Sequence, residues 1–186
     1  SSRPLIMTLD SSTGNVGIGK SSIDMARDGR TALEIGAEGT LYSNTTSAQG
    51  GITGLGHNYY YDSSNQAKFM RANEEAATME IYNGGFYFYS DSRTDQSADA
   101  NASVTSKLTI LANGNVGIGT DNPAYLLDVE GAVNNDWLVQ LTNTSTTNPQ
   151  GLFVRVNDAD SNGSLFGLNN NGTYHMLVSA TGNVGI

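Results

Sequence analysis

The sequence predicts an all-β protein built from short strands and tight turns. Apolar and polar residues alternate in short runs separated by Gly- and Asn-rich breaks, which is the pattern of strands. The 186 residues include 22 Gly but only 3 Pro, and only 15% are charged, a balance that favours many turns. With 38% hydrophobic residues, 9 Tyr and 5 Phe, the chain has more apolar side chains than disordered proteins typically carry.

Composition disfavours several classes of partner. The formal net charge is −9, whereas sequence-independent binding of nucleic acids relies on Lys and Arg that neutralise phosphates. Anionic membrane surfaces are disfavoured for the same reason, and no apolar run approaches the roughly 18 residues of a membrane-spanning helix. The chain has no cysteine, so disulfides and thiolate chemistry are absent. We expect neither a nucleic-acid partner nor membrane insertion.

A pentapeptide, Gly-Asn-Val-Gly-Ile, occurs three times, at residues 14–18, 114–118 and 182–186. Each copy follows a short apolar run and a turn, and the second turn contains Asn113-Gly114. An Asn-Gly pair favours the tight turn of a β-hairpin. Each copy is therefore predicted to be the return strand of a small hairpin.

Side chains in this return strand alternate between two faces. Val16 and Ile18 share one face, and Gly17 and Gly19 fall on the other. Glycines at alternate positions usually let another backbone approach closely. An isolated hairpin is marginally stable in water, so we expect hairpins of identical chains to pool their aliphatic side chains around one axis. The predicted core residues are Val16, Ile18, Val116, Ile118, Val184 and Ile186, and the predicted close-approach glycines are Gly17, Gly19, Gly117, Gly119 and Gly185.

The copies are unevenly spaced, which favours modules joined by hairpin connectors over a regular solenoid. We expect each module to be a β-sandwich or a β-prism. In the larger module, Asn83-Gly84-Gly85 predicts a hairpin turn. The predicted segments are a connector at 1–19, a larger β module at 20–107, a connector at 108–119, a smaller β meander module at 120–175 and the start of a further connector at 176–186. Strands of the smaller module are predicted at 137–141, 152–156, 165–168 and 174–176.

The residues after the second copy extend the pattern. Thr120-Asp121-Asn122-Pro123 is followed by Leu127-Asp128-Val129-Glu130-Gly131. This resembles a recurrent element of bacteriophage tail fibres, in which a Gly-Asn-Val-Gly-Ile-Gly-Thr stretch precedes a Ser-Pro-like step and a Leu-x-Val-x-Gly strand. The first copy departs from the pattern, because Gly19-Lys20-Ser21-Ser22 lacks the Pro and reaches the equivalent strand, residues 33–35, after a longer insertion.

The resemblance implies an intertwined homotrimeric fibre of the virion, exposed outside the cell, with other virion tail proteins as partners. Such proteins often end in a self-cleaving, endosialidase-type intramolecular chaperone domain, and no such domain is visible in this sequence. Similar repeats also suit bacterial surface proteins, so an extracellular bacterial adhesin or filament stays open as an alternative.

Aromatic residues are densest at residues 59–61 and 82–89. Aromatic rings can stack on sugars while phenol hydroxyls form hydrogen bonds, so a bacterial cell-surface glycan is a candidate partner. Alternating aromatics in strands more often pack half in the core and half on the surface, and the sequence favours that interpretation. The candidate glycan-binding residues are Tyr60, Tyr87 and Tyr89, with His57 and Asn58 as polar partners.

Metal and catalytic motifs are weak. Residues 158–163, Asp-Ala-Asp-Ser-Asn-Gly, match the first half of a calcium loop, but the twelfth position is Asn169 in place of Glu. A polysaccharide-depolymerising tailspike would need two carboxylates at a fixed separation, and Glu74, Glu75 and the acidic residues at 91–95 qualify only by residue type. We expect no metal, no cofactor and no enzymatic activity, and a structural and adhesive role in a tail fibre; the depolymerase stays open as an alternative.

Overall fold

The computed structural model describes residues 7–12, 14–19, 30–44, 51–62, 64, 66–133, 137–147, 150–154, 164–170, 173–179 and 183–185. These residues form strands and no helix, which confirms the all-β prediction. Accordingly, the described part of the chain contains no helix that could cross a membrane. The chain divides into two compact units, Ser1–Leu138 and Val139–Ile186.

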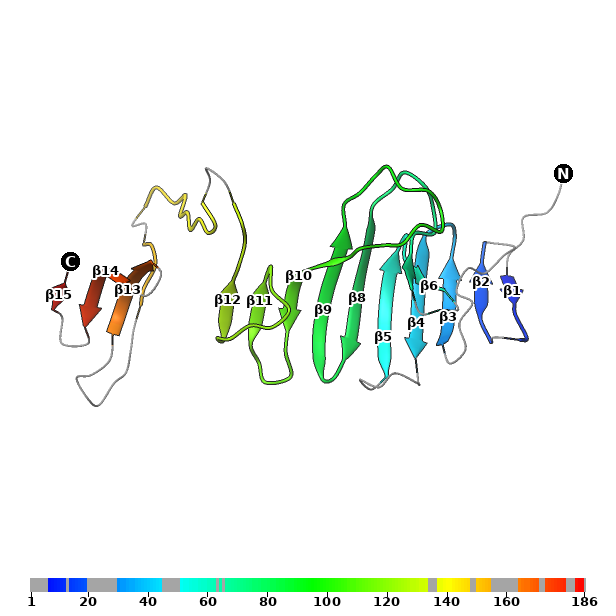
Figure 1. Cartoon of the computed structure of the whole chain (residues 1–186), viewed down its shortest axis with the longest axis horizontal. Coiled ribbons are helices and arrows are strands. Elements are labelled where there is room, and N and C mark those ends of the chain that lie inside the picture. Colours follow the sequence, from blue (N-terminus) through cyan, green and yellow to red (C-terminus); the bar gives the residue numbers. More distant parts are fainter. Residues whose placement is uncertain are drawn as a thin grey trace. The chain divides into compact units, whose positions relative to one another are not determined.

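The first unit contains one ten-stranded sheet with the order β1-β2-β3-β4-β5-β8-β9-β10-β11-β12. Figure 1 shows these strands side by side in a single layer. Neighbouring strands are antiparallel except for the pairs β2–β3 and β11–β12, which are parallel. The bounds are β1 Met7–Leu9, β2 Val16–Ile18, β3 Arg30–Ile35, β4 Gly39–Asn44, β5 Ile52–His57, β8 Ala76–Tyr82, β9 Gly85–Asp91, β10 Thr105–Ile110, β11 Val116–Ile118 and β12 Leu127–Val129.

The repeated pentapeptide forms the return strand of a hairpin at both ends of this sheet, β1–β2 and β10–β11. The loops close in the same way: Leu111 N donates to Asn115 O at 2.9 Å, and Asp10 N donates to Asn15 O at 2.9 Å. Each return strand then pairs in parallel with the next strand, β3 or β12. The longer insertion after the first copy therefore leaves the strand pairing unchanged.

The hairpins are continuous with the strands between them. Strand β10 pairs with β11 on one side and with β9 on the other, so the predicted boundary at 107/108 falls within one strand of the sheet. The turn between β8 and β9 has the form predicted from the sequence, since Asn83 and Gly84 have φ values of 49° and 74°, as a type I′ turn requires.

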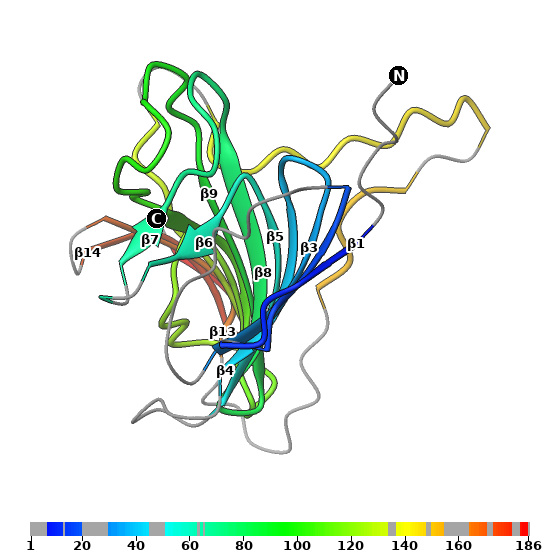
Figure 2. The ribbon, with the colours of Figure 1, turned by 90° about the vertical axis from the view of Figure 1, so that its right-hand side faces the viewer.

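One face of the sheet is covered by segments of the same chain. The short strands β6 (Tyr60–Tyr61) and β7 (Ala67–Lys68) pair with each other, and Figure 2 shows them on one side of β5 and β8. Phe69 N donates to Ala100 O at 3.0 Å, which ties two covering segments together. The core lies beneath them and consists of Ala32, Tyr42, Tyr59, Tyr60, Phe69, Met70 and Ala76. No described segment of the chain covers the opposite face, and the single chain therefore does not distinguish a β-sandwich from a β-prism.

The second unit contains a three-stranded sheet of β13 (Ser164–Asn170), β14 (Thr173–Ser179) and β15 (Val184–Gly185). The third pentapeptide follows the hairpin pattern, since Ser179 N donates to Asn183 O at 2.9 Å. The strand predicted at residues 137–141 is wrong: no described strand pairs with it, and Trp137 is 82% exposed. Residues 152–154 likewise form no strand. The calcium-loop candidate at 158–163 lies outside the described residues.

Candidate functional site

Strand pairing aligns apolar side chains across the whole sheet. Every one of the ten strands contributes one apolar residue to a single central row, in which each residue is the direct register partner of the next. This row is Leu9, Val16, Leu33, Leu41, Leu55, Met79, Phe88, Leu108, Ile118 and Val129. On one side of it lie Met7, Ile18 and Ile35, and on the other Ile81, Phe86, Ile110, Val116 and Leu127.

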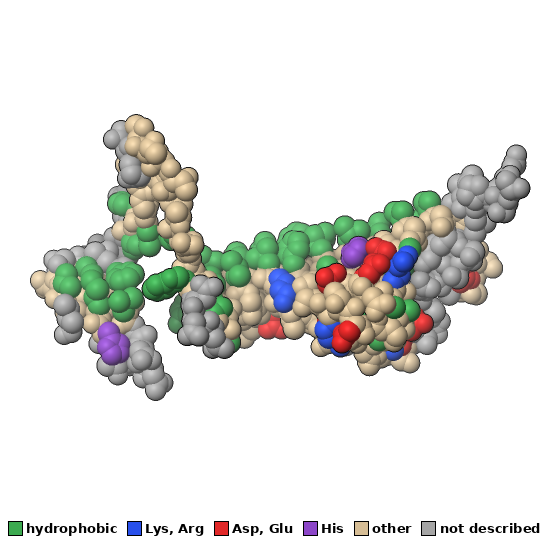
Figure 3. All heavy atoms as spheres, turned by 90° about the horizontal axis from the view of Figure 1, so that it is seen from above, with side chains coloured by type: hydrophobic (Ala, Val, Ile, Leu, Met, Phe, Trp, Pro, Cys, Tyr) green, Lys and Arg blue, Asp and Glu red, His purple; other side chains and the backbone are tan. Residues whose placement is uncertain are grey.

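We call these residues together the apolar face. None of them is charged, and many are well exposed, Leu55 by 54%. Figure 3 shows them as a continuous apolar band along the sheet. At the usual strand spacing the face is about 40 Å long and about 14 Å wide, so about 600 Å² of apolar surface faces water. That area is at the upper limit for the largest patch on a typical monomer, and such patches mark interaction sites.

On the covered face, Tyr42 crosses a neighbouring strand to reach β8. A side chain at Gly54 of β5 would overlap the Tyr42 ring, so the glycine provides the space for the crossing. The Tyr42 hydroxyl donates to Glu80 Oε1 at 2.6 Å and lies 2.9 Å from Thr78 Oγ1. Burial, and secondly the charge of Glu80, raise the pKa of Tyr42, so the phenol stays protonated as a donor.

Glu80 is a nearly buried carboxylate, only 4% exposed. Its Oε1 atom accepts a second hydrogen bond from the Tyr61 hydroxyl at 3.1 Å. Burying a charge is unfavourable unless hydrogen bonds replace those of water, and the two phenols supply part of that replacement. The carboxylate is thereby held in one position by side chains from β4 and β6.

Three tyrosines of β8 and β9 stack beside this carboxylate. The rings of Tyr82 and Tyr87 have centroids 4.1 Å apart at an interplanar angle of 14°, and those of Tyr87 and Tyr89 are 6.1 Å apart at 2°. The Tyr82 and Tyr89 hydroxyls lie 2.9 Å apart. Burial, and then the hydrogen bond with Tyr82, raise the pKa of Tyr89.

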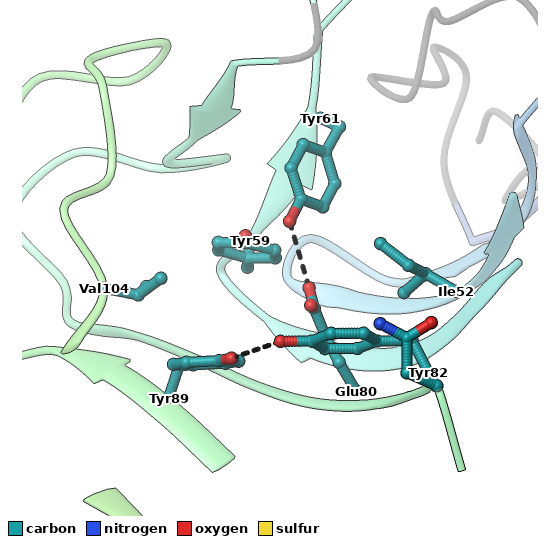
Figure 4. A pocket seen from close by; sticks show the side chains of 8 residues that line it. Ile52, Tyr59, Tyr61, Glu80, Tyr82, Tyr89 and Val104 are labelled. Atoms are coloured by element: carbon teal, nitrogen blue, oxygen red, sulfur yellow. Dashed lines mark hydrogen bonds between the residues drawn. The ribbon is translucent and has the colours of Figure 1, made fainter. Parts of the chain in front are cut away.

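These groups surround a cavity of about 410 Å³, which we call the tyrosine cavity. It opens on the face of the sheet opposite the apolar face, because Glu80, Tyr82 and Tyr89 alternate with apolar-face residues along β8 and β9. Figure 4 shows Tyr61 pointing towards Glu80, with the hydroxyls of Tyr82 and Tyr89 meeting below. The lining residues are Ile52, Tyr59, Tyr61, Glu80, Tyr82, Asn83, Tyr89 and Val104.

The five residues predicted to bind a glycan do not form one site. Tyr89 lines the tyrosine cavity, and Tyr87 is buried in the stack beside it. Tyr60 is buried and donates to Asp99 Oδ1 at 2.6 Å. Asn58 is fully buried and supports the backbone, since its Oδ1 accepts from Arg71 N at 2.7 Å. His57 pairs in register with Gly39 and Ala77, in line with the apolar face and away from the tyrosines.

Among the cavity residues, Tyr59, Tyr61 and Tyr82 belong to the aromatic group noted in the sequence but were not among the candidate binding residues, and Glu80 was missed altogether. For Glu80 and Tyr82, the sequence signal was the alternation of side chains between the two faces of β8. There Thr78, Glu80 and Tyr82 share the covered face, while Met79 and Ile81 belong to the apolar face. An acidic residue at an inward position between a threonine and a tyrosine indicates a hydrogen-bonded carboxylate.

The predicted residues of the pentapeptide divide between the two faces. Val16, Ile18, Val116 and Ile118 lie on the apolar face, and Val184 is exposed in the second unit, while Ile186 lies outside the described residues. Gly17 and Gly117 are buried on the opposite face. A Cβ atom at Gly117 would lie 2.6 Å from Thr120 O, so a backbone does approach closely, and it belongs to the same chain. Gly19 and Gly119 follow the strands with φ values of 74° and 79°, and a Cβ at Gly185 would meet open space.

Glu38, His57 and Glu74 form the one group of potential metal ligands among the residues that the structure describes. Arg71 Nε lies 3.4 Å from Glu38 Oε1 and 3.6 Å from Glu74 Oε1. A guanidinium between the two carboxylates already supplies the positive charge that a metal ion would bring. We therefore interpret this group as a cluster of ion pairs.

No protein family model fits the chain, and no curated protein is significantly similar to it in sequence. The apolar face and the tyrosine cavity are therefore the features of the chain that bear on its function.

Proposed function

We propose that this chain is a structural and adhesive segment of a homotrimeric fibre of the bacteriophage tail-fibre type. The observation that carries the proposal is the apolar face, which joins all ten strands and includes the Val and Ile residues of the repeat. An uncharged surface of this size is stabilised by removal from water at about 25 cal/mol per Å². A second and third copy of the chain are its proposed occupants.

The dimensions of the sheet favour three copies. A six-residue strand such as β4 is about 20 Å long. In a triangular prism with sides of that length, each sheet lies about 6 Å from the central axis, close to half of the about 10 Å between packed sheets. Side chains from three sheets would then fill the centre. The row of ten strands would run along the prism axis, as a fibre shaft requires.

A non-enzymatic role is part of the proposal. Glycoside hydrolysis generally uses two carboxylates that flank the scissile bond, and Glu80 is the single carboxylate among the described residues lining the tyrosine cavity. Asp91, an acidic candidate from the sequence, is held by Arg93 outside that cavity. Incubation with host polysaccharide followed by a reducing-sugar assay separates the fibre from the depolymerase, and release of sugar would overturn this part of the proposal.

The location in a virion rests on the sequence resemblance alone. A bacterial adhesin or filament would need the same trimeric assembly, but it would be attached to a bacterial cell surface and not to a phage virion. Detection of the chain in purified phage particles by mass spectrometry supports the tail-fibre assignment. Its recovery only from bacterial cell surfaces would contradict it.

The assembly is tested by native mass, measured by light scattering coupled to gel filtration. We expect a trimer for the unmodified chain. Leu55→Asp places a charge in the centre of the apolar face and is expected to abolish the trimer. Ala72→Asp adds the same charge at an exposed turn outside the face and should leave the trimer intact. A folded β-rich monomer, or a dimer formed by two stacked sheets, would overturn the trimeric arrangement.

A further inference from the structure

We propose that the tyrosine cavity binds a neutral sugar ring. The inference deepens the proposed adhesive function and rests on it, but the site itself lies within one chain. Its volume of about 410 Å³ falls in the range of roughly 300–1,000 Å³ that is typical of small-molecule sites.

The lining combines the two kinds of contact that a sugar requires. A pyranose ring has an apolar face of C–H groups and an edge of hydroxyls. The near-parallel rings of Tyr82 and Tyr89 offer aromatic surface for the C–H groups. The carboxylate of Glu80 and the amide of Asn83 offer acceptors and donors for the hydroxyls.

Glu80 has unused capacity to accept hydrogen bonds. A carboxylate has about four acceptor positions, and both hydrogen bonds described above reach Oε1. Within the described part of the chain, Oε2 accepts none. Two hydroxyls of a sugar could donate to the positions that are left, and because Tyr42 and Tyr61 fix the carboxylate, it is already oriented before the ligand arrives.

Charge and donor chemistry narrow the ligand class. No Lys or Arg is among the described residues that line the cavity, so an acidic sugar would meet the negative charge of Glu80 without compensation. A quaternary ammonium ligand would be drawn to the same charge and to ring faces. Its ammonium group cannot donate hydrogen bonds, however, and would leave the remaining acceptor positions of Glu80 unused. A neutral sugar ring rich in hydroxyls can stack on the tyrosine rings and also donate hydrogen bonds to the Glu80 carboxylate.

The position of the cavity fits adhesion by a fibre. It opens on the covered face, away from the apolar face, so in the proposed trimer each chain would present one cavity outwards. Three weak sites on one trimeric fibre give an overall avidity well above the affinity of a single site. Millimolar binding by each cavity would therefore suffice for attachment.

The test measures binding of D-glucose, D-galactose and N-acetyl-D-glucosamine to the full chain by saturation-transfer NMR, with N-acetylneuraminic acid and choline for comparison. We expect at least one neutral sugar to bind and the other two compounds not to bind. Glu80→Gln keeps the shape of the side chain and should weaken binding at least tenfold. Tyr125→Ala removes an exposed tyrosine outside the cavity and should leave binding unchanged.

Val104→Trp provides a second variant that does not touch Glu80. The larger side chain projects from the wall of the cavity and fills it, so sugar binding should be abolished. Native mass and melting temperature should stay unchanged. This variant tests the site even if Glu80→Gln fails to fold. Absence of binding by all three neutral sugars would overturn the proposal. So would binding that survives Val104→Trp, or binding of only N-acetylneuraminic acid or choline. Since native mass is measured separately, a failed site in an intact trimer is distinguishable from a failed fibre assignment.

Discussion

Replacement of Gly54 by alanine tests whether Tyr42 depends on a missing side chain in β5. The added Cβ would overlap the Tyr42 ring, and this ring is only 1% exposed, so it has no room to move without leaving the core. Displacing it would break the 2.6 Å hydrogen bond to Glu80. A hydrogen bond to a charged group contributes about 1.5–3 kcal/mol, and overpacking of a core costs about 1–3 kcal/mol. We expect Gly54→Ala to lower the free energy of unfolding by about 3–5 kcal/mol.

A double-mutant cycle with Tyr42→Ala isolates this cause. Once the ring is absent, the Cβ at position 54 meets no obstacle from it, and alanine in a strand is intrinsically more favourable than glycine by about 0.5–1 kcal/mol. Gly54→Ala should therefore be neutral or stabilising by up to about 1 kcal/mol in the Tyr42→Ala background. Tyr42→Phe removes only the hydroxyl and keeps the ring, so it should lower the free energy of unfolding by about 1.5–3 kcal/mol through loss of the hydrogen bond to Glu80.

The assay is urea unfolding followed by circular dichroism at one fixed protein concentration, because the stability of an oligomer depends on concentration. Residues in contact show coupling energies of about 0.5–3 kcal/mol, and the direct overlap of these two positions places the expected coupling at or above the upper end of that range. If Gly54→Ala lowers the free energy of unfolding by the same amount with Tyr42 present and in the Tyr42→Ala background, overlap with the Tyr42 ring is not the cause of the destabilisation.

Two further measurements test other parts of the chain. Hydrogen bonding from Arg93 lowers the pKa of Asp91 to about 2, so Asp91 stabilises the fold fully above its unfolded pKa of about 3.9 and loses that contribution as the pH falls to about 2. Urea unfolding at pH 5 and pH 2.5 should show a loss of about 2 kcal/mol that Asp91→Asn lacks, and equal pH dependence in both proteins would contradict it. At the same position of the repeat, Gly117→Ala should destabilise by about 1–3 kcal/mol through contact with Thr120 O, whereas Gly185→Ala should change stability by less than about 0.5 kcal/mol. Equal melting temperatures for these two variants would show that the contact carries no energy.

The hairpins were predictable because their determinants are local. Asn83-Gly84 adopts positive φ values at both positions, and such a pair favours the same tight turn wherever it joins two strands. The strand predicted at 137–141 shows the limit of this reasoning. Alternating residues there satisfy the pattern of a strand, but a strand also needs a neighbour to pair its backbone groups, and sequence periodicity says nothing about neighbours.

The candidate site was less predictable because it depends on register. Sequence proximity grouped His57 and Asn58 with the tyrosines, although His57 lies in line with the apolar face and Asn58 is buried beneath a covering segment. Glu80 was missed because its partners come from β4 and β6, far away in sequence. Alternation assigns each side chain to a face, but only pairing across strands shows which side chains of one face meet.

Alternation along β8 also explains how one sheet could serve both proposed roles. Met79 and Ile81 belong to the apolar face, and Glu80 between them reaches the tyrosine cavity on the other side. A change at Ile81 therefore bears on assembly, and a change at Glu80 bears on binding, although the two residues are adjacent. Because strands paired on both sides hold their side chains rigidly, a cavity built on them keeps its geometry without a loop that must order on binding. If Ile81→Asp abolished the trimer and the separated chain still bound a neutral sugar, the two faces would be shown to act independently.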